Sequence, residues 1–210
     1  MDSAPASLKP RKSPVQARSL ATVGALHTAT IQVLTRQGLS GCTTTRVAER
    51  AGMSVGSLYQ YYPNRDALLA AVLDKHLDGV AGAVEHACRI HRDQPVSAMA
   101  SALATAFLAA KLHDPQESKA LYAVAADRGG AELAARAHAR IVAAIAAMLT
   151  SAPDARFDDP STTATIALNA LIGPVRAWLE GHAQAGFEAR LEEHLVRLLT
   201  AYLETYRLRP

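Results

Sequence analysis

Cysteines, aromatic residues and long apolar runs are scarce in this chain of 210 residues. Cys42 and Cys88 lie far apart and form no CxxC pair, so nothing indicates a disulfide framework or a cysteine metal site. No uninterrupted apolar run approaches the ~18 to 20 residues that span a bilayer. Residues 1–16 have no apolar core after their basic residues and therefore do not resemble a signal peptide. We expect a soluble, cytoplasmic protein without a membrane partner.

Patterns typical of strands and of enzyme sites are absent as well. Aromatic residues make up only 5% of the chain, whereas half of it is hydrophobic and rich in alanine, which favours helices packed closely through small side chains. The eight histidines form no i, i+4 pair and no HExxH motif. We therefore expect an all-α protein with no metal, no cofactor and no enzymatic activity.

Positive charge is concentrated at the N-terminal end. Residues 1–65 carry eight Lys and Arg and two acidic residues, a net charge of +6, whereas residues 66–210 carry 14 basic and 17 acidic residues, a net charge of −3. Such an asymmetry is typical of a protein that binds a polyanion. A solvated surface with a basic tail gives the same charges, so the charge alone does not decide.

Residues 43–69, TTTRVAERAGMSVGSLYQYYPNRDALL, organise the rest of the chain. Apolar positions recur at helical spacing over residues 45–51, and Gly52 is suited to end that helix. Ser54 is suited to cap a second helix. The buried edge of this second helix is predicted to contain Leu58, Tyr61 and Tyr62. Helix, glycine turn and helix form the helix-turn-helix pattern, which favours DNA as the polyanion.

A competing motif, G-x-S-x-G, lies in residues 52–56 of the same stretch. In α/β-hydrolases this motif forms the nucleophile elbow, which requires a buried strand directly before it. The preceding residues have the pattern of an amphipathic helix that carries Arg46, Glu49 and Arg50. The sequence therefore argues against a hydrolase.

At these residues the chain resembles the TetR family of transcriptional regulators. The family pattern is a Thr-rich helix start, an Ala-Gly-apolar-Ser turn, a Leu-Tyr-x-x-aromatic recognition helix and a Pro-polar-basic-acidic-Ala-Leu-Leu entry into the fourth helix. The matching segments are residues 43–45, 51–54, 58–62 and 63–69. The match covers roughly the first third of the chain, and one departure is Tyr61, where relatives often have His.

The resemblance implies that the second helix of the motif lies in the major groove of double-stranded DNA. Candidates for contacts to base edges are Val55, Gly56, Ser57 and Tyr59, with Arg46 as a possible addition. Candidates for contacts to phosphate are Thr43, Thr44, Tyr59, Tyr61 and Arg65. Core packing is an equal alternative for Tyr61 and the preferred interpretation for Tyr62.

The N-terminal third is expected to contain two parts. Residues 1–15, which prolines interrupt, are predicted to be a disordered basic arm that either contacts DNA or is an inert leader. Residues 16–64 are predicted to form the helix-turn-helix DNA-binding domain, whose first helix covers residues 17–37 and ends at Gly38. His27 in that helix stands where relatives commonly have an apolar residue, and we expect it to be a packing residue.

Residues 65–210 are predicted to form a helical effector-binding and dimerisation domain. Residues 65–89 are its connecting helix, which in the TetR family joins the DNA-binding part to the rest. Prolines and a Gly-Gly pair place five further helices near residues 95–112, 115–127, 131–150, 160–182 and 188–207. With four helices before them, the total is nine, as in the family.

The last two predicted helices are apolar around more of their circumference than one core stripe requires. The side chains concerned are Ile166, Leu168, Leu171, Ile172, Val175, Trp178 and Leu179, and Leu191, Leu195, Val196, Leu198, Leu199, Tyr202, Leu203 and Tyr206. Pairing with a symmetry mate would form a four-helix bundle, so we predict a homodimer. A monomer with a larger core is the alternative.

The resemblance also implies an enclosed pocket for a small-molecule effector. Large apolar side chains that could line it are Met99, Leu103, Phe107, Tyr122, Ile141, Ile145, Met148 and Trp178. Each of them is also explained by core packing. Basic side chains that could hold an anionic ligand, or that form a solvated face, are Arg128, Arg136, His138 and Arg140.

Taken together, the sequence predicts a sequence-specific DNA-binding transcriptional regulator. It would be a repressor that a small, largely apolar ligand releases from a pseudo-palindromic operator. One alternative is a helical small-molecule-binding protein or enzyme whose DNA-binding head is non-functional. Another is a DNA-packaging protein without sequence preference.

Overall fold

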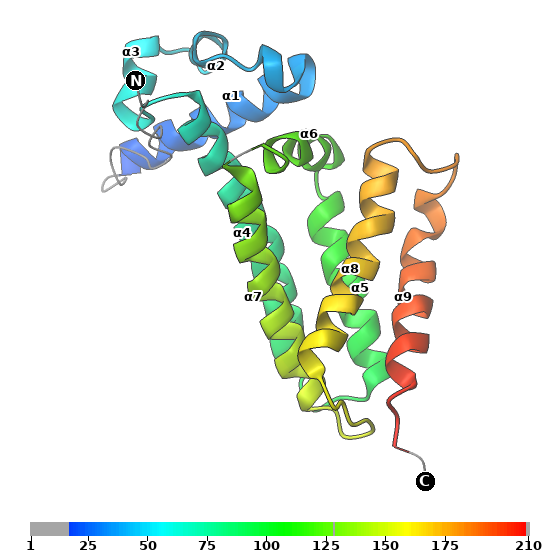
Figure 1. The fold of residues 1–210 in the computed structure, drawn as a ribbon. Helices are drawn as coiled ribbons and strands as arrows, with labels where there is room; N and C mark the ends of the chain where they lie inside the picture. Colours follow the sequence, from blue (N-terminus) through cyan, green and yellow to red (C-terminus); the bar gives the residue numbers. More distant parts are fainter. Residues whose placement is uncertain (1–16, 128, 209–210) are drawn as a thin grey trace, which may run out of the picture. The chain divides into compact units, whose positions relative to one another are not determined.

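The computed structural model describes residues 17–127 and 129–208. Within these residues the chain forms nine α-helices and no β-sheet (Figure 1). They are α1 (Ala17–Gly41), α2 (Thr44–Arg50), α3 (Val55–Tyr61), α4 (Arg65–Ile90), α5 (Val96–Leu112), α6 (Pro115–Ala125), α7 (Gly130–Thr150), α8 (Pro160–Leu179) and α9 (Glu188–Glu204). The predicted all-α class is therefore confirmed. The predicted basic arm, residues 1–15, and Arg128 lie outside the described residues.

Contacts within the chain divide it into two compact units, which we call the head and the body. The head contains the residues up to His76 together with Ala120–Ala134. The body contains Leu77–Lys119 and Ala135–Pro210. The head thus includes α1, α2, α3 and the first part of α4, whereas α5, α8 and α9 belong wholly to the body.

Polar side chains cap three helices of the head. The side-chain oxygens of Thr43, Ser54 and Asn64 precede α2, α3 and α4, and each accepts a hydrogen bond from the backbone N–H three residues later, over 3.3, 3.1 and 2.8 Å. Such caps satisfy backbone donors that the first turn of a helix leaves unpaired. The predicted caps Ser54 and Asn64 are confirmed.

Two glycines set the ends of α1 and α2. Gly38 has φ 69° and ψ −178°, so the regular part of α1 ends there as predicted, and a further turn extends the helix to Gly41. Gly52, which follows the C-cap Ala51 of α2, also has φ 69°. This left-handed region favours glycine, because a Cβ atom there approaches the backbone too closely. The turn between α2 and α3 therefore depends on Gly52.

The core of the head is built from one apolar edge of each helix. Its buried side chains include Leu26, Ala29, Val33 and Leu34 from α1, Val47 and Ala48 from α2, Leu58 from α3, and Leu68, Leu69 and Val72 from α4. Helix α2 packs against both α1 and α3. This packing fixes α3 by its inner edge and leaves its other side at the surface.

The body contains longer apolar stripes. On α5 the buried residues follow helical spacing from Val96 to Lys111, and α9 buries a row of leucines four residues apart, Leu191, Leu195, Leu199 and Leu203. Helix α5 packs most extensively against α9, and α8 packs against both. The five predicted helices of this region are all present, with ends that differ from the prediction by at most three residues. Pro95 lies just before α5 rather than inside it.

Candidate nucleic-acid interface

Helix α3 presents a polar, partly exposed surface opposite its buried residue. Leu58 is fully buried, whereas Gly56 and Tyr59 are exposed and Val55 and Ser57 are half-buried. The four residues predicted to read base edges therefore all lie outside the core and within the first five positions of one helix. A helix that enters the major groove uses its N-terminal residues in this way.

The N-terminus of α3 is held by two serines. Ser54 caps the helix, and its hydroxyl also lies 2.9 Å from the hydroxyl of Ser57. Beside them, a Cβ atom added at Gly56 would meet only the Ser54 hydroxyl, at 3.7 Å. The fold therefore has room for a side chain at Gly56. Because glycine has none, the surface at the start of α3 stays open there.

A hydroxyl pair connects α2 with α3. The Thr44 hydroxyl, at the start of α2, lies 3.2 Å from the phenolic oxygen of Tyr59, which is 41% exposed. Thr43, the cap of α2, is exposed beside Thr44. The predicted phosphate contacts Thr43, Thr44 and Tyr59 are thus gathered at the surface between the two helices.

The two arginines of the predicted interface already have intramolecular partners. Arg46 donates from Nη1 to the carbonyl oxygen of Gly41 over 2.9 Å, which satisfies the end of α1. Arg65 donates from Nε to Asp66 Oδ1 over 3.1 Å. Because a guanidinium has five N–H donors, each arginine keeps donors for a phosphate. Reading a base with Arg46 would require it to leave Gly41.

The two adjacent tyrosines that follow have different environments. Tyr61 is half-buried, whereas Tyr62 is 3% exposed and bonds through its hydroxyl to Nε2 of His27 on α1, over 2.7 Å. The core interpretation of Tyr62 is confirmed, and His27 is the packing residue that the sequence suggested. The bond between them was not anticipated, because 35 residues separate them.

The G-x-S-x-G motif does not form a nucleophile elbow here. The residues directly before it form helix α2, not a strand, and the Ser54 hydroxyl caps α3.

Burial raises the pKa of the thiols of Cys42 and Cys88 to about 11 and about 12, so both remain protonated at neutral pH. Neither the serine nor the cysteines resemble an activated nucleophile.

Most residues predicted to line an effector pocket are core residues of the body. Met99, Leu103, Phe107, Ile141, Ile145 and Met148 are buried. Trp178 is half-buried and donates its indole N–H to Glu188 over 3.0 Å, and Tyr122, half-buried, belongs to the head. A groove of about 550 Å³ runs along α4 and α5, lined by five alanines, Ile90 and polar side chains such as His86. None of the eight predicted residues contributes to it.

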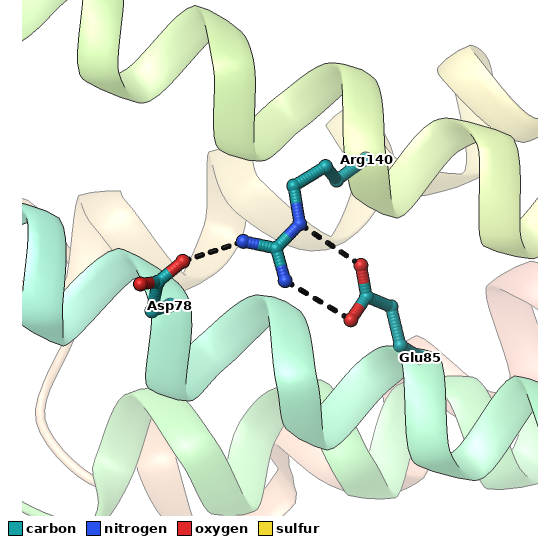
Figure 2. Close-up of polar contacts among 3 residues, drawn as sticks. All are labelled: Asp78, Glu85 and Arg140. Atoms are coloured by element: carbon teal, nitrogen blue, oxygen red, sulfur yellow. Dashed lines mark hydrogen bonds and ion pairs between the residues drawn. The ribbon is translucent and has the colours of Figure 1, made fainter.

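One basic residue of α7 is engaged by acidic residues of α4. Figure 2 shows the guanidinium of Arg140 between Asp78 and Glu85: it donates to both carboxylate oxygens of Glu85, over 3.0 and 3.1 Å, and to Asp78. The hydrogen bonds to Glu85 and then to Asp78 raise the pKa of Arg140. Arg140 therefore connects α7 with α4.

By length and composition alone α7, and α5 and α6 taken as one bent span, could cross a bilayer.

Helices α8 and α9 carry apolar side chains that the body does not bury. Ile166 is 47% exposed and Leu198 is 48% exposed. Further half-buried side chains are Ile172, Trp178, Val196, Tyr202 and Tyr206. These side chains are part of the set from which the sequence predicted a dimer interface, whereas the leucine row of α9 faces the core.

Two family models match this chain. One, described as bacterial regulatory proteins of the tetR family, matches residues 26–72. The other, described as a tetracyclin repressor-like C-terminal domain, matches residues 95–203. The two matches cover the helix-turn-helix and the helices from α5 to α9.

Solved structures share the fold at low sequence identity. A protein assigned to the TetR family of transcriptional regulators, from Mesorhizobium loti MAFF303099, is 20% identical, with a TM-score of 0.75 over 92% of this chain and 100% of that one. A transcriptional regulator from Rhodococcus sp. Rha1 is 18% identical, with a TM-score of 0.72 over 90% and 99%. The fatty acid degradation regulator FadR from Bacillus halodurans is 13% identical, with a TM-score of 0.66 over 84% and 97%. No curated protein sequence matches this chain.

Proposed function

The chain belongs to the TetR family of transcriptional regulators, and we propose that it is a cytoplasmic repressor of transcription that binds DNA sequence-specifically. The observation that carries this proposal is the surface of α3. Val55, Gly56, Ser57 and Tyr59, four of its first five residues, lie outside the core, its N-terminus is capped by Ser54, and the hydroxyls of Thr44 and Tyr59 lie beside it.

In this proposal α3 lies in the major groove. Val55 contacts a thymine methyl group, Ser57 bonds a base edge, and Gly56 lets the backbone approach the bases closely. Tyr59 adds a base contact or bonds phosphate together with Thr43 and Thr44. Tyr61 and Arg65 extend these phosphate contacts. Arg46 adds a base contact when it leaves Gly41.

We further propose that two copies pair through α8 and α9. The exposed Ile166 and Leu198, together with the half-buried Trp178 and Tyr202 of the same two helices, supply apolar surface that a partner would cover. A two-fold dimer presents two recognition helices, which suits a pseudo-palindromic operator with half-sites about one helical turn apart.

The effector in this proposal is a small, largely apolar molecule that binds in the body, among the side chains predicted to line a pocket. Its binding favours a spacing of the two heads that no longer fits two successive major grooves. We infer the apolar character of the effector from Met99, Phe107, Ile145 and Met148, whose buried side chains are thioether, aromatic and aliphatic groups.

Selection of bound fragments from sheared source DNA at near-physiological salt, followed by sequencing, tests the proposal. We expect enrichment of one or a few pseudo-palindromic sites, with an affinity that falls steeply as salt rises, because phosphate contacts release counterions. Retention without enrichment would indicate a DNA-packaging protein. No retention would favour the alternative of a small-molecule-binding protein or enzyme with a non-functional head.

A further inference from the structure

A buried hydrogen bond connects the end of the recognition helix with α1. Tyr62 is the residue that directly follows α3, and its backbone N–H still bonds to the carbonyl oxygen of Leu58. Its hydroxyl lies 2.7 Å from Nε2 of His27. His27 and Tyr62 are 7% and 3% exposed, and their ring centroids are 6.0 Å apart. The bond therefore joins two helices of the head deep in its core.

The pair is not the most favourable solution for stability alone. Nδ1 of His27 is buried and has no hydrogen-bond partner among the described residues. An unpartnered buried polar atom is unfavourable, whereas two apolar side chains of the same shape would be neutral or stabilising. Burial, and then the charge of Lys75, lower the pKa of His27 to about 4, and burial raises the pKa of Tyr62 to about 12. Both side chains are thus neutral at physiological pH.

What a hydrogen bond adds to apolar packing is direction. Burial of apolar surface is non-directional, but an O–H···N bond favours one distance and one angle. Tyr62 follows Tyr59 by three residues and precedes Arg65 by three, so it lies within the predicted phosphate-contact segment. Fixing its side chain against α1 restricts how far α3 can rotate or shift on the core.

We propose that His27 and Tyr62 are positioning residues for the recognition helix: their bond holds the C-terminal end of α3 against α1 and keeps the DNA-reading surface in one orientation. This inference rests on the proposed DNA-binding function. It goes beyond that function because it assigns a role to two side chains that are too buried to touch DNA.

The test separates positioning from stability with apolar variants. In the double variant His27→Leu, Tyr62→Phe we expect an unchanged or higher melting temperature, and an affinity for the selected operator that is lower by roughly three- to tenfold, which is the range of one lost hydrogen bond. The single variant His27→Gln, whose amide can still bond the Tyr62 hydroxyl, should bind the operator more tightly than the double variant and nearly as tightly as the wild type. An unchanged affinity in the folded double variant would overturn the proposal.

Thr30→Val provides the matched control. Thr30 is also buried on α1, but its hydroxyl bonds to the carbonyl of Leu26 within the same helix, over 2.7 Å. Loss of the Thr30 hydroxyl should leave operator affinity unchanged. If Thr30→Val lowered the affinity as much as the double variant does, a specific role for the His27–Tyr62 bond would be contradicted.

Amide hydrogen exchange of Val55–Tyr61 without DNA provides a second readout. We expect faster exchange in the double variant than in the wild type and in Thr30→Val, because α3 loses its fixed end. If the wild type selects no operator, the proposed function fails, and this measurement still decides on the bond: faster exchange supports it and unchanged exchange overturns it.

Discussion

Among the described residues, the head has a buried bond between two side chains far apart in the chain, whereas the body makes such bonds at its surface. In the head, the bond between His27 and Tyr62 joins residues far apart in the chain and lies in the core. In the body, the bonds of Arg140 to Asp78 and Glu85 and of Thr105 to Glu192 lie at the surface. A buried bond enforces one geometry, whereas exposed ion pairs are weakened by solvent and adapt readily. We therefore expect the head to hold one arrangement more strictly than the body does.

Removing one buried leucine from each unit should show whether the two units are stable independently. Leu58 in α3 and Leu199 in α9 are both fully buried, and Leu→Ala at either should lower the free energy of unfolding by about 2–5 kcal/mol. We expect Leu58→Ala to raise amide exchange mainly in α1, α2 and α3, and Leu199→Ala to raise it mainly in α5, α8 and α9. Equal increases throughout the chain in both variants would show one cooperative unit.

Acid should destabilise the head through His27. Its pKa is about 4 in the folded chain and about 6.5 when unfolded, so the unfolded state binds the proton more readily. Protonation of His27 therefore does not affect the free energy of unfolding above pH 6.5. Between pH 6.5 and 4 it lowers the free energy of unfolding by about 3 kcal/mol. Unfolding by denaturant measured at pH 7, 5 and 4 should show this decrease in the wild type. His27→Leu is the control: a decrease of the same size in that variant would assign the effect to carboxylates.

Loss of a predicted phosphate contact should weaken DNA binding without unfolding the chain. Tyr59→Ala and Arg65→Ala each remove a partly exposed donor beside α3, and each should lower operator affinity by about tenfold. Arg65→Ala should also reduce the salt dependence of binding, because it removes a cation, whereas Tyr59→Ala should not. Arg197→Ala, on the exposed side of α9, is a matched control, because it also removes a cation that bonds to a nearby acid. Titration of labelled operator at two salt concentrations measures both quantities. Unchanged affinity in both head variants would refute the phosphate assignment.

Gly56 allows binding to be separated from stability. Alanine at this helical position meets no close neighbour and favours the helix, so Gly56→Ala should raise the free energy of unfolding by up to about 1 kcal/mol. The added methyl group should nevertheless lower operator affinity about tenfold, because it enters the space that a base pair needs. Gly79→Ala on α4, where a Cβ atom meets nothing within 4 Å, should stabilise the fold without changing operator affinity. Equal affinities of the two variants would remove Gly56 from the interface.

Local signals explain why the sequence predicted so much of the head. Ser54 and Asn64 bond only three residues ahead, and Gly52 needs only its own backbone angle, so each is visible within one turn of helix. The same logic located all nine helices to within a few residues. The base-edge residues came from the resemblance and stay a prediction; the structure adds that Val55, Gly56, Ser57 and Tyr59 lie outside the core beside the buried Leu58.

Contacts between distant segments could not be predicted in this way. The partners of His27 and Arg140 lie 35 to 62 residues away in the chain, and each bond depends on which faces of two helices meet. Periodicity identifies the apolar face of a helix but not the helix that covers it. For the same reason the sequence left Arg140 between a ligand contact and a solvated face, and only the position of α4 beside α7 shows that it binds carboxylates.

The smallest effect is expected where the body relies on exposed charge. Arg140→Met removes the bonds to Asp78 and Glu85 but keeps an apolar stem against α4. Because all three side chains are at least partly exposed, the melting temperature should fall less than in any leucine variant, and the difference from the wild type should disappear in 1 M salt, which screens the pairs. Arg197→Met on α9 serves as a control for one exposed ion pair within a single helix. A salt-independent loss as large as that of Leu199→Ala would contradict the comparison, since it would mean that the body too depends on one fixed polar contact.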